Sequence, residues 1–112
     1  MAEIRYTAEF KRNLRHLAKK YPNIRADLEP LLNRLQAGET PGDQVQHVRY
    51  TVYKVRLPNR DARRGKSGGY RVIYYVQAAE QIILVTLYSK TEQGDIEPAQ
   101  IRQIIETSDT SA

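Results

Sequence analysis

Apolar side chains near the start of the chain repeat at helical spacing. Between Thr7, which can cap a helix, and Pro22, which ends one, they recur at i, i+4, i+7, i+8 and i+11 on one stripe. The same spacing returns over residues 24–35, and Gly38 is a natural C-terminal stop for that segment. Pro30 lies inside the segment and predicts a kink or a break. Two amphipathic segments with a two-residue joint are typical of a helical hairpin.

Beyond these helices the apolar period changes to two. Apolar and polar positions alternate in three segments, at residues 50–57, 70–76 and 82–90. A polar turn and a short turn join the segments, so we expect an antiparallel meander. Both faces of the segments carry apolar residues, which indicates that both faces of the sheet are partly covered.

Two shorter patterns complete the predicted fold. Residues 3–6 predict a first strand, and Pro98 opens a last amphipathic helical stretch. We therefore predict an α+β fold, in which an antiparallel sheet (the short N-terminal strand plus the three-strand meander) packs on the two N-terminal helices, with a short C-terminal helix. A chain of 112 residues favours one domain, which we place at residues 1–108, with a polar tail at 109–112.

Composition narrows the setting of this fold. The chain has no cysteine, which excludes disulfides, zinc–thiolate sites and thiol nucleophiles. The N-terminal segment lacks the apolar core of a signal peptide. The longest apolar run is a few residues, against roughly 20 needed to cross a bilayer. These features predict a cytoplasmic protein without a membrane partner.

Positive charge is concentrated in one stretch of the chain. The net charge is +5, and residues 49–71 hold eight basic residues and one acidic residue, or +7. The ten basic and twelve acidic residues elsewhere leave −2. Such concentration indicates a polyanion as partner. The alternative is a solvated basic loop that aids solubility.

Part of this stretch, RRGKSGGY at residues 63–70, looks like the end of a phosphate-binding loop. A P-loop needs a glycine where this chain has Arg60, and a helix afterwards where this chain has a strand. We therefore set nucleotide hydrolysis aside. The stretch is then either a glycine-rich hairpin turn with solvated side chains, or a basic loop that grips a nucleic-acid backbone. In the second interpretation the RNA-binding residues of the loop are Arg60, Arg63, Arg64, Lys66 and Ser67.

The strand patterns place more cations on one face of the meander. That face is predicted to hold Lys54, Arg56, Arg71, Tyr75, Thr86, Tyr88 and Lys90. The opposite face is apolar and is expected to hold the helices; it consists of Tyr53, Val55, Leu57, Val72, Tyr74, Val76, Ile83, Val85 and Leu87. A slip of one residue would scatter the cationic set. Like charges on adjacent strands repel each other, which indicates a bound phosphate rather than ordinary exposed strand residues.

Few side chains near this face suit catalysis by a metal or a histidine. No cluster of acids and histidines has metal-ligand spacing, so we expect no metal site and no cofactor. His16 is expected on a helix surface, and His47 is a weaker candidate for the site. The nearby acids are Glu92, Asp95 and Glu97.

RNA offers another route, because its 2′-hydroxyl can attack the adjacent phosphate without a metal. A lysine among other cations is a candidate base, since its charged form is disfavoured. The predicted roles are Lys54 as base, Arg56 and Arg71 for phosphate charge, Lys90 or Tyr88 for the leaving oxygen, and Tyr75 for stacking on a base.

Three segments carry a resemblance to a known family: YKVRLP (53–58), RGKSGGYRVIYYV (64–76) and ILVTLYSKTE (83–92). They resemble the RelE/ParE toxins of bacterial type II toxin–antitoxin systems. A basic Gly-Lys-Ser-Gly-Gly loop before an Arg-Val-Ile-Tyr strand is similar to the HigB-like branch. The resemblance implies an mRNA endonuclease that acts on translating ribosomes and binds a cognate antitoxin.

The resemblance also implies site residues. Lys54 and Arg56 match the family's basic pair on the second strand, Arg71 matches the arginine that opens the third, and Lys90 falls near a basic residue after the last. RelE has a tyrosine a few residues further on, where this chain has Ile96. The candidates to replace it are Tyr75 and Tyr88.

Two other functions stay open. One is a ParE-like inhibitor of DNA gyrase, which binds protein and catalyses nothing. The other is an inactive toxin relic that only binds RNA. A gyrase inhibitor has no need of the cations on the strands, so these residues favour the ribonuclease.

Overall fold

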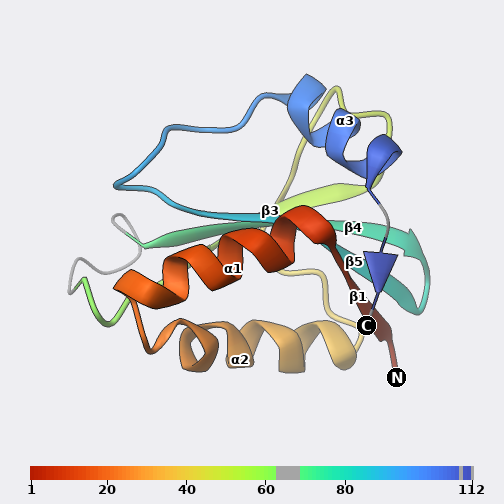
Figure 1. The fold of residues 1–112 in the computed structure, drawn as a ribbon. Coiled ribbons are helices and arrows are strands. Elements are labelled where there is room, and N and C mark those ends of the chain that lie inside the picture. Colours follow the sequence, from red (N-terminus) through yellow and green to blue (C-terminus); the bar gives the residue numbers. More distant parts are fainter. Residues whose placement is uncertain (63–68, 109, 112) are drawn as a thin grey trace.

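The computed structural model describes residues 1–62, 69–108 and 110–111. Figure 1 shows the elements, which follow the order β1 (Glu3–Thr7), α1 (Ala8–Lys20), α2 (Ile24–Gln36), β2 (Asp43–Gln44), β3 (Val52–Leu57), β4 (Tyr70–Ala78), β5 (Gln81–Ser89), α3 (Pro98–Thr107) and β6 (Thr110–Ser111). Within the described residues, no helix is long and apolar enough to pass through a bilayer.

The strands form one sheet in the order β2-β3-β4-β5-β1-β6. β3, β4 and β5 are the predicted antiparallel meander, and the α+β fold class is confirmed. The sheet is mixed rather than antiparallel throughout, because β1 runs parallel to β5, with Glu3 opposite Gln81. An alternating pattern does not encode the direction of a strand that pairs from far along the chain. The strands β2 and β6, of two residues each, are too short to leave a periodic signal.

Both faces of the sheet carry helices. Figure 1 shows α1 and α2 side by side on one face and α3 on the other. The Thr7 hydroxyl starts α1: it accepts a hydrogen bond from the Phe10 N–H (3.0 Å) and donates one to the Val85 carbonyl (2.6 Å). The second helix continues through Pro30 without a break, because Pro30 is exposed while Leu28 and Leu31 anchor the buried side.

Each face has its own apolar core. The larger core lies under α1 and α2 and includes Phe10, Leu35, Val72, Tyr74 and Leu84. The smaller core lies under α3 and comprises Val48, Val52, Ile73, Val85, Tyr88 and Ile101. The meander therefore has no solvated apolar face, as the sequence predicts.

A bulge in β5 changes which residues share a face. Ile73 pairs with Thr86 and Tyr74 with Leu84, so Val85 is an extra residue on β5. Of the predicted set Ile83, Val85 and Leu87, Leu87 does pack under the N-terminal helices, where Leu84 joins it, but Val85 packs under α3. A bulge leaves no mark on apolar alternation until the strands are paired.

Candidate nucleic-acid interface

The end of the α3-side face that lies beyond α3 is cationic. Arg56 on β3 stands directly opposite Arg71 on β4, and Arg71 stands opposite Tyr88 on β5. The side chain of Arg71 is buried, with 6% of its surface exposed, and its Nη1 donates to the Tyr70 carbonyl at 3.3 Å. Arg56 is exposed. Two like charges directly opposite each other destabilise a sheet, so this pairing needs a reason other than stability.

Two lysines extend this cationic end. Lys54 precedes Arg56 by two residues on the same face, and Lys90 follows β5. The two ammonium groups meet at one carboxylate oxygen: Asp95 Oδ1 lies 3.1 Å from Lys90 Nζ and 3.6 Å from Lys54 Nζ. The hydrogen bond from Lys90 and the charge of Lys54 lower the pKa of Asp95, so the carboxylate is ionised at neutral pH. The structure thus brings together Lys54, Arg56, Arg71 and Lys90, hereafter the cationic end.

Tyr88 lies beside the cationic end, opposite Arg71, but its side chain is buried. Only 4% of its surface is exposed, and it packs in the core under α3. Its hydroxyl is buried near the backbone of Ile96 and forms no hydrogen bond with the described residues. Burial, and then the charge of Asp95, raises the pKa of Tyr88. The phenol therefore keeps its proton well above neutral pH and has no open path to a substrate.

A glycine fixes the edge strand beside Lys54. Gly42 has a φ of +96° and lies so close to β3 that an added Cβ would come within 2.4 Å of the Lys54 carbonyl oxygen. Only glycine fits this approach. β2 then pairs with β3, with Asp43 opposite Lys54, and covers the outer edge of the meander.

Two other predicted RNA-binding residues lie elsewhere. Arg60 Nε is 2.9 Å from Oδ1 of Asp27, a buried residue of α2, which ties Arg60 to the helix on the opposite face. Tyr75 lies four residues along β4 from Arg71, where its ring meets the ring of Tyr50 at 5.2 Å. The remaining predicted contacts, Arg63, Arg64, Lys66 and Ser67, lie outside the described residues.

A comparison with known protein families assigns the chain to one of them. The family model described as "RelE toxin of RelE / RelB toxin-antitoxin system" matches residues 47–112, more than half of the sequence. The chain belongs to the RelE toxin family. The matched region contains every residue of the cationic end, while α1 and α2 precede it. No match was found among curated proteins. A RelE toxin has a cognate antitoxin as partner, and assignment to the HigB-like branch stays a prediction.

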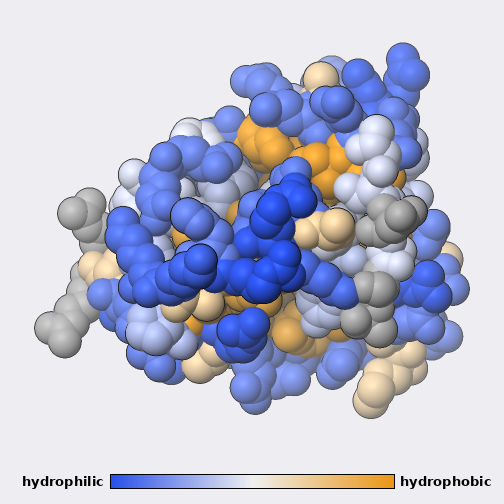
Figure 2. Space-filling model, viewed as in Figure 1, coloured by the Kyte–Doolittle hydropathy of each residue, from blue (hydrophilic) through white to orange (hydrophobic). Residues whose placement is uncertain are grey.

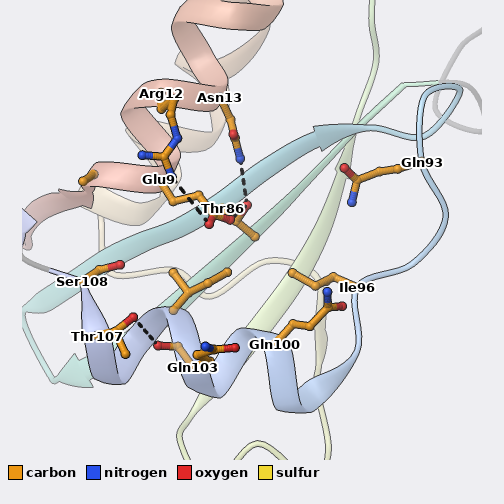
Figure 3. A pocket seen from close by; sticks show the side chains of 12 residues that line it. Glu9, Arg12, Asn13, Thr86, Gln93, Ile96, Gln100, Gln103, Thr107 and Ser108 are labelled. Atoms are coloured by element: carbon orange, nitrogen blue, oxygen red, sulfur yellow. Dashed lines mark hydrogen bonds and ion pairs between the residues drawn. The ribbon is translucent and has the colours of Figure 1, made fainter.

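This RelE toxin also has a polar cleft of about 760 Å³ between α1 and α3. Figure 3 shows Thr86 at its floor, where Thr86 Oγ1 accepts from Asn13 Nδ2 (3.1 Å) and donates to Glu9 Oε2 (3.0 Å). Thr86 lies on the predicted face, because it pairs with Ile73, which pairs with Lys54. It is 2% exposed and bonded to α1, however, so it is not part of an open surface with the cations. Figure 2 shows apolar surface between the hydrophilic side chains of the two helices.

One functional residue escapes sequence reasoning. Asp95 is among the acids named near the site, but no pattern in the segment between β5 and α3 indicates that it meets both lysines. Charge alternation along a strand or helix gives such a signal, whereas an irregular segment has no period from which to infer direction. Gln93 and Ile96 of the same segment line the cleft, so the segment separates the cleft from the cationic end.

Proposed function

We propose that this RelE toxin is a ribosome-dependent mRNA endonuclease that cleaves by attack of the RNA's own 2′-hydroxyl. The observation that carries the proposal is a cluster of four cations at one end of the sheet, where exposed Arg56 stands opposite the buried Arg71, beside two half-buried lysines. A phosphate bound beside these groups would accept several charged hydrogen bonds. The family supplies the biological setting, a toxin held in check by an antitoxin.

The proposed step moves two protons and exchanges one bond. The 2′-oxygen attacks the adjacent phosphorus, and its proton passes to a base. A bond forms between the 2′-oxygen and phosphorus as the bond from phosphorus to the 5′-oxygen breaks. A proton from an acid completes the leaving 5′-hydroxyl, and the upstream fragment ends in a 2′,3′-cyclic phosphate.

The residues of the cationic end divide these tasks. Arg71 and Arg56 hold the phosphate oxygens and stabilise the negative charge that grows in the transition state. Lys54 takes the 2′-proton, and Lys90 supplies the proton of the leaving group. Tyr88 supports Arg71 from the neighbouring strand and takes no part in proton transfer, because its hydroxyl is buried.

Partners and place of action follow from this proposal. The substrate is mRNA held in the ribosomal A site, so the toxin would act in the cytoplasm, and the cognate antitoxin would inhibit it. The predicted rim contacts Arg63, Arg64, Lys66 and Ser67 would touch RNA outside the cleaved bond, whereas Arg60 is paired with Asp27 of α2. Tyr75 lies under the α3 end of the face, and its stacking role stays a prediction.

The test uses ribosomes programmed with a defined mRNA. The toxin is added, and new 5′ ends are mapped by primer extension. We expect cleavage within the A-site codon and none of the same mRNA free in solution at equal toxin concentration. No cleavage, together with inhibition of DNA gyrase supercoiling, would replace the ribonuclease with the ParE-like function. RNA binding without either activity would leave the inactive relic.

A further inference from the structure

A carboxylate already contacts the two lysines to which the proposed function brings the RNA. Asp95 Oδ1 contacts both lysine ammonium groups of the cationic end, at 3.1 and 3.6 Å. Among the described residues, Asp95 is the one acid that forms an ion pair with Lys54 or Lys90. An anionic oxygen between two ammonium groups has the charge and geometry of one phosphate oxygen.

The segment that carries Asp95 directs this contact. It runs between β5 and α3 without regular structure, but both of its ends are fixed. On one side the Glu92 N–H donates to the Ser89 carbonyl (3.0 Å). On the other, Ile96 packs against the core under α3, and Glu97 caps that helix. Asp95 is therefore held over the lysines by its neighbours.

The contact itself is easy to break. The Asp95 side chain is 61% exposed and each lysine side chain 33% exposed. Exposed ion pairs contribute little to stability, because water and salt screen them. An incoming phosphate that brings contacts of its own can displace such a carboxylate without unfolding any element.

We propose that Asp95 is an internal competitor for the RNA phosphate, occupying the position between Lys54 and Lys90 until a substrate displaces it. The proposal rests on the proposed function. The competition would favour RNA on the ribosome over free RNA. Free RNA must displace a tethered anion with its backbone contacts alone, whereas RNA already positioned by a ribosome loses less entropy when it displaces Asp95. The carboxylate thus weakens binding to free RNA and leaves the chemistry to the cations.

The low pKa of Asp95 keeps this competitor charged. Lys90 and Lys54 both favour the carboxylate form, and protonation occurs only in acid, below the ordinary range of an aspartate. The competition therefore operates throughout the neutral range.

The test compares two variants that change the net charge equally. Asp95→Asn removes the competitor while keeping the side chain's shape. Glu80→Gln is the control, because Glu80 is exposed and lies in the turn at the other end of β4 and β5, roughly 25 Å away. Asp95→Glu keeps the charge. The probe is a short single-stranded RNA with 2′-O-methyl groups, which cannot be cleaved. Its affinity is measured by fluorescence anisotropy at salt concentrations from roughly 50 to 200 mM, over which contacts to the phosphate backbone weaken strongly.

We expect Asp95→Asn to bind the probe about fivefold or more tightly than wild type at low salt, with Glu80→Gln within about twofold. The slope of log affinity against log salt should steepen by up to about 0.7 in Asp95→Asn, since a further cation becomes free to neutralise a phosphate. Asp95→Glu should behave as wild type. This change of slope would not follow from a merely structural role.

Equal affinities for Asp95→Asn and Glu80→Gln would overturn the proposal, as would weaker binding or no binding by Asp95→Asn. Two outcomes distinguish a failure of the competitor proposal from a failure of the proposed function. Cleavage on ribosomes with an unchanged Asp95→Asn affinity contradicts the competitor alone. Tighter binding by Asp95→Asn without cleavage by any variant contradicts the ribonuclease alone.

Discussion

The α3-side face of the meander has two ends built on the same strands with opposite chemistry. Under α3, the side chains of Val52, Ile73 and Val85 are buried among apolar neighbours. Beyond α3, the same strands carry Arg56 opposite Arg71, with two lysines alongside. The apolar end stabilises the sheet by burial, whereas the cationic end brings like charges together.

The difference separates stability from function on one surface. Burial of the apolar end lowers the free energy of the folded state. At the cationic end, the cross-strand pair Arg56 and Arg71 brings two like charges together, which by itself is unfavourable in a sheet. Substitutions at the cationic end should therefore change the cleavage rate, and substitutions at the apolar end should change the free energy of unfolding.

Arg71→Ala should lower the rate of mRNA cleavage on ribosomes by about 100- to 1000-fold, the range seen when one donor to a developing negative charge is removed. Because Arg71 is buried, the substitution should also cost some stability, so the rates are corrected for the folded fraction. Rates are read from primer extension and stability from urea denaturation. Arg34→Ala, an exposed arginine of α2 paired with Glu39, is the matched control. A similar loss of rate in both variants would contradict the assignment.

Ile101→Ala should lower the free energy of unfolding by about 2–4 kcal/mol, because Ile101 is 1% exposed in the core under α3 and its loss leaves a cavity. Cleavage per folded molecule should stay near wild type. Urea denaturation gives the first quantity, and rates corrected for the folded fraction give the second. A 100-fold loss of corrected rate would mean that the two ends do not act separately.

Lys54→Ala should lower the cleavage rate by about 100-fold, the lower end of what one acid–base group contributes. The exposed Lys19 of α1 provides a control with the same charge change, since Lys19→Ala should cut at nearly the wild-type rate. If both variants lost activity equally, net charge rather than the site would explain the effect.

Tyr88→Phe should change the cleavage rate by less than about threefold, because the hydroxyl is buried without a hydrogen bond among the described residues. The folded-state pKa of Tyr88 is raised, so its contribution to stability is present below pH 10 and is lost as pH rises further. Between pH 8 and pH 10.5 the melting temperature should therefore fall more in wild type than in Tyr88→Phe. A tenfold lower cleavage rate would contradict this expectation and indicate that the Tyr88 hydroxyl takes part in proton transfer.

The sequence predicts much of this molecule because its signals are local. The helical stripes, the three alternating strands and the parity that brings Arg56, Arg71 and Lys54 to one face are all read within short windows. What it misses depends on pairing at a distance. The bulge moves Val85 to the α3 side, Asp27 pairs with Arg60 across to α2, and Asp95 reaches the lysines from an irregular segment. None of these leaves a period in the sequence.

The most direct test of the account asks whether the RNA supplies the nucleophile. Ribosomes are programmed with an mRNA that carries one 2′-deoxy nucleotide on the upstream side of the mapped cleavage site, beside the all-ribose control. We expect the control to yield a 2′,3′-cyclic phosphate and a 5′-hydroxyl end, and the substituted mRNA to stay uncut at that bond. Cleavage of the substituted bond at the control rate, leaving a 5′-phosphate, would contradict it.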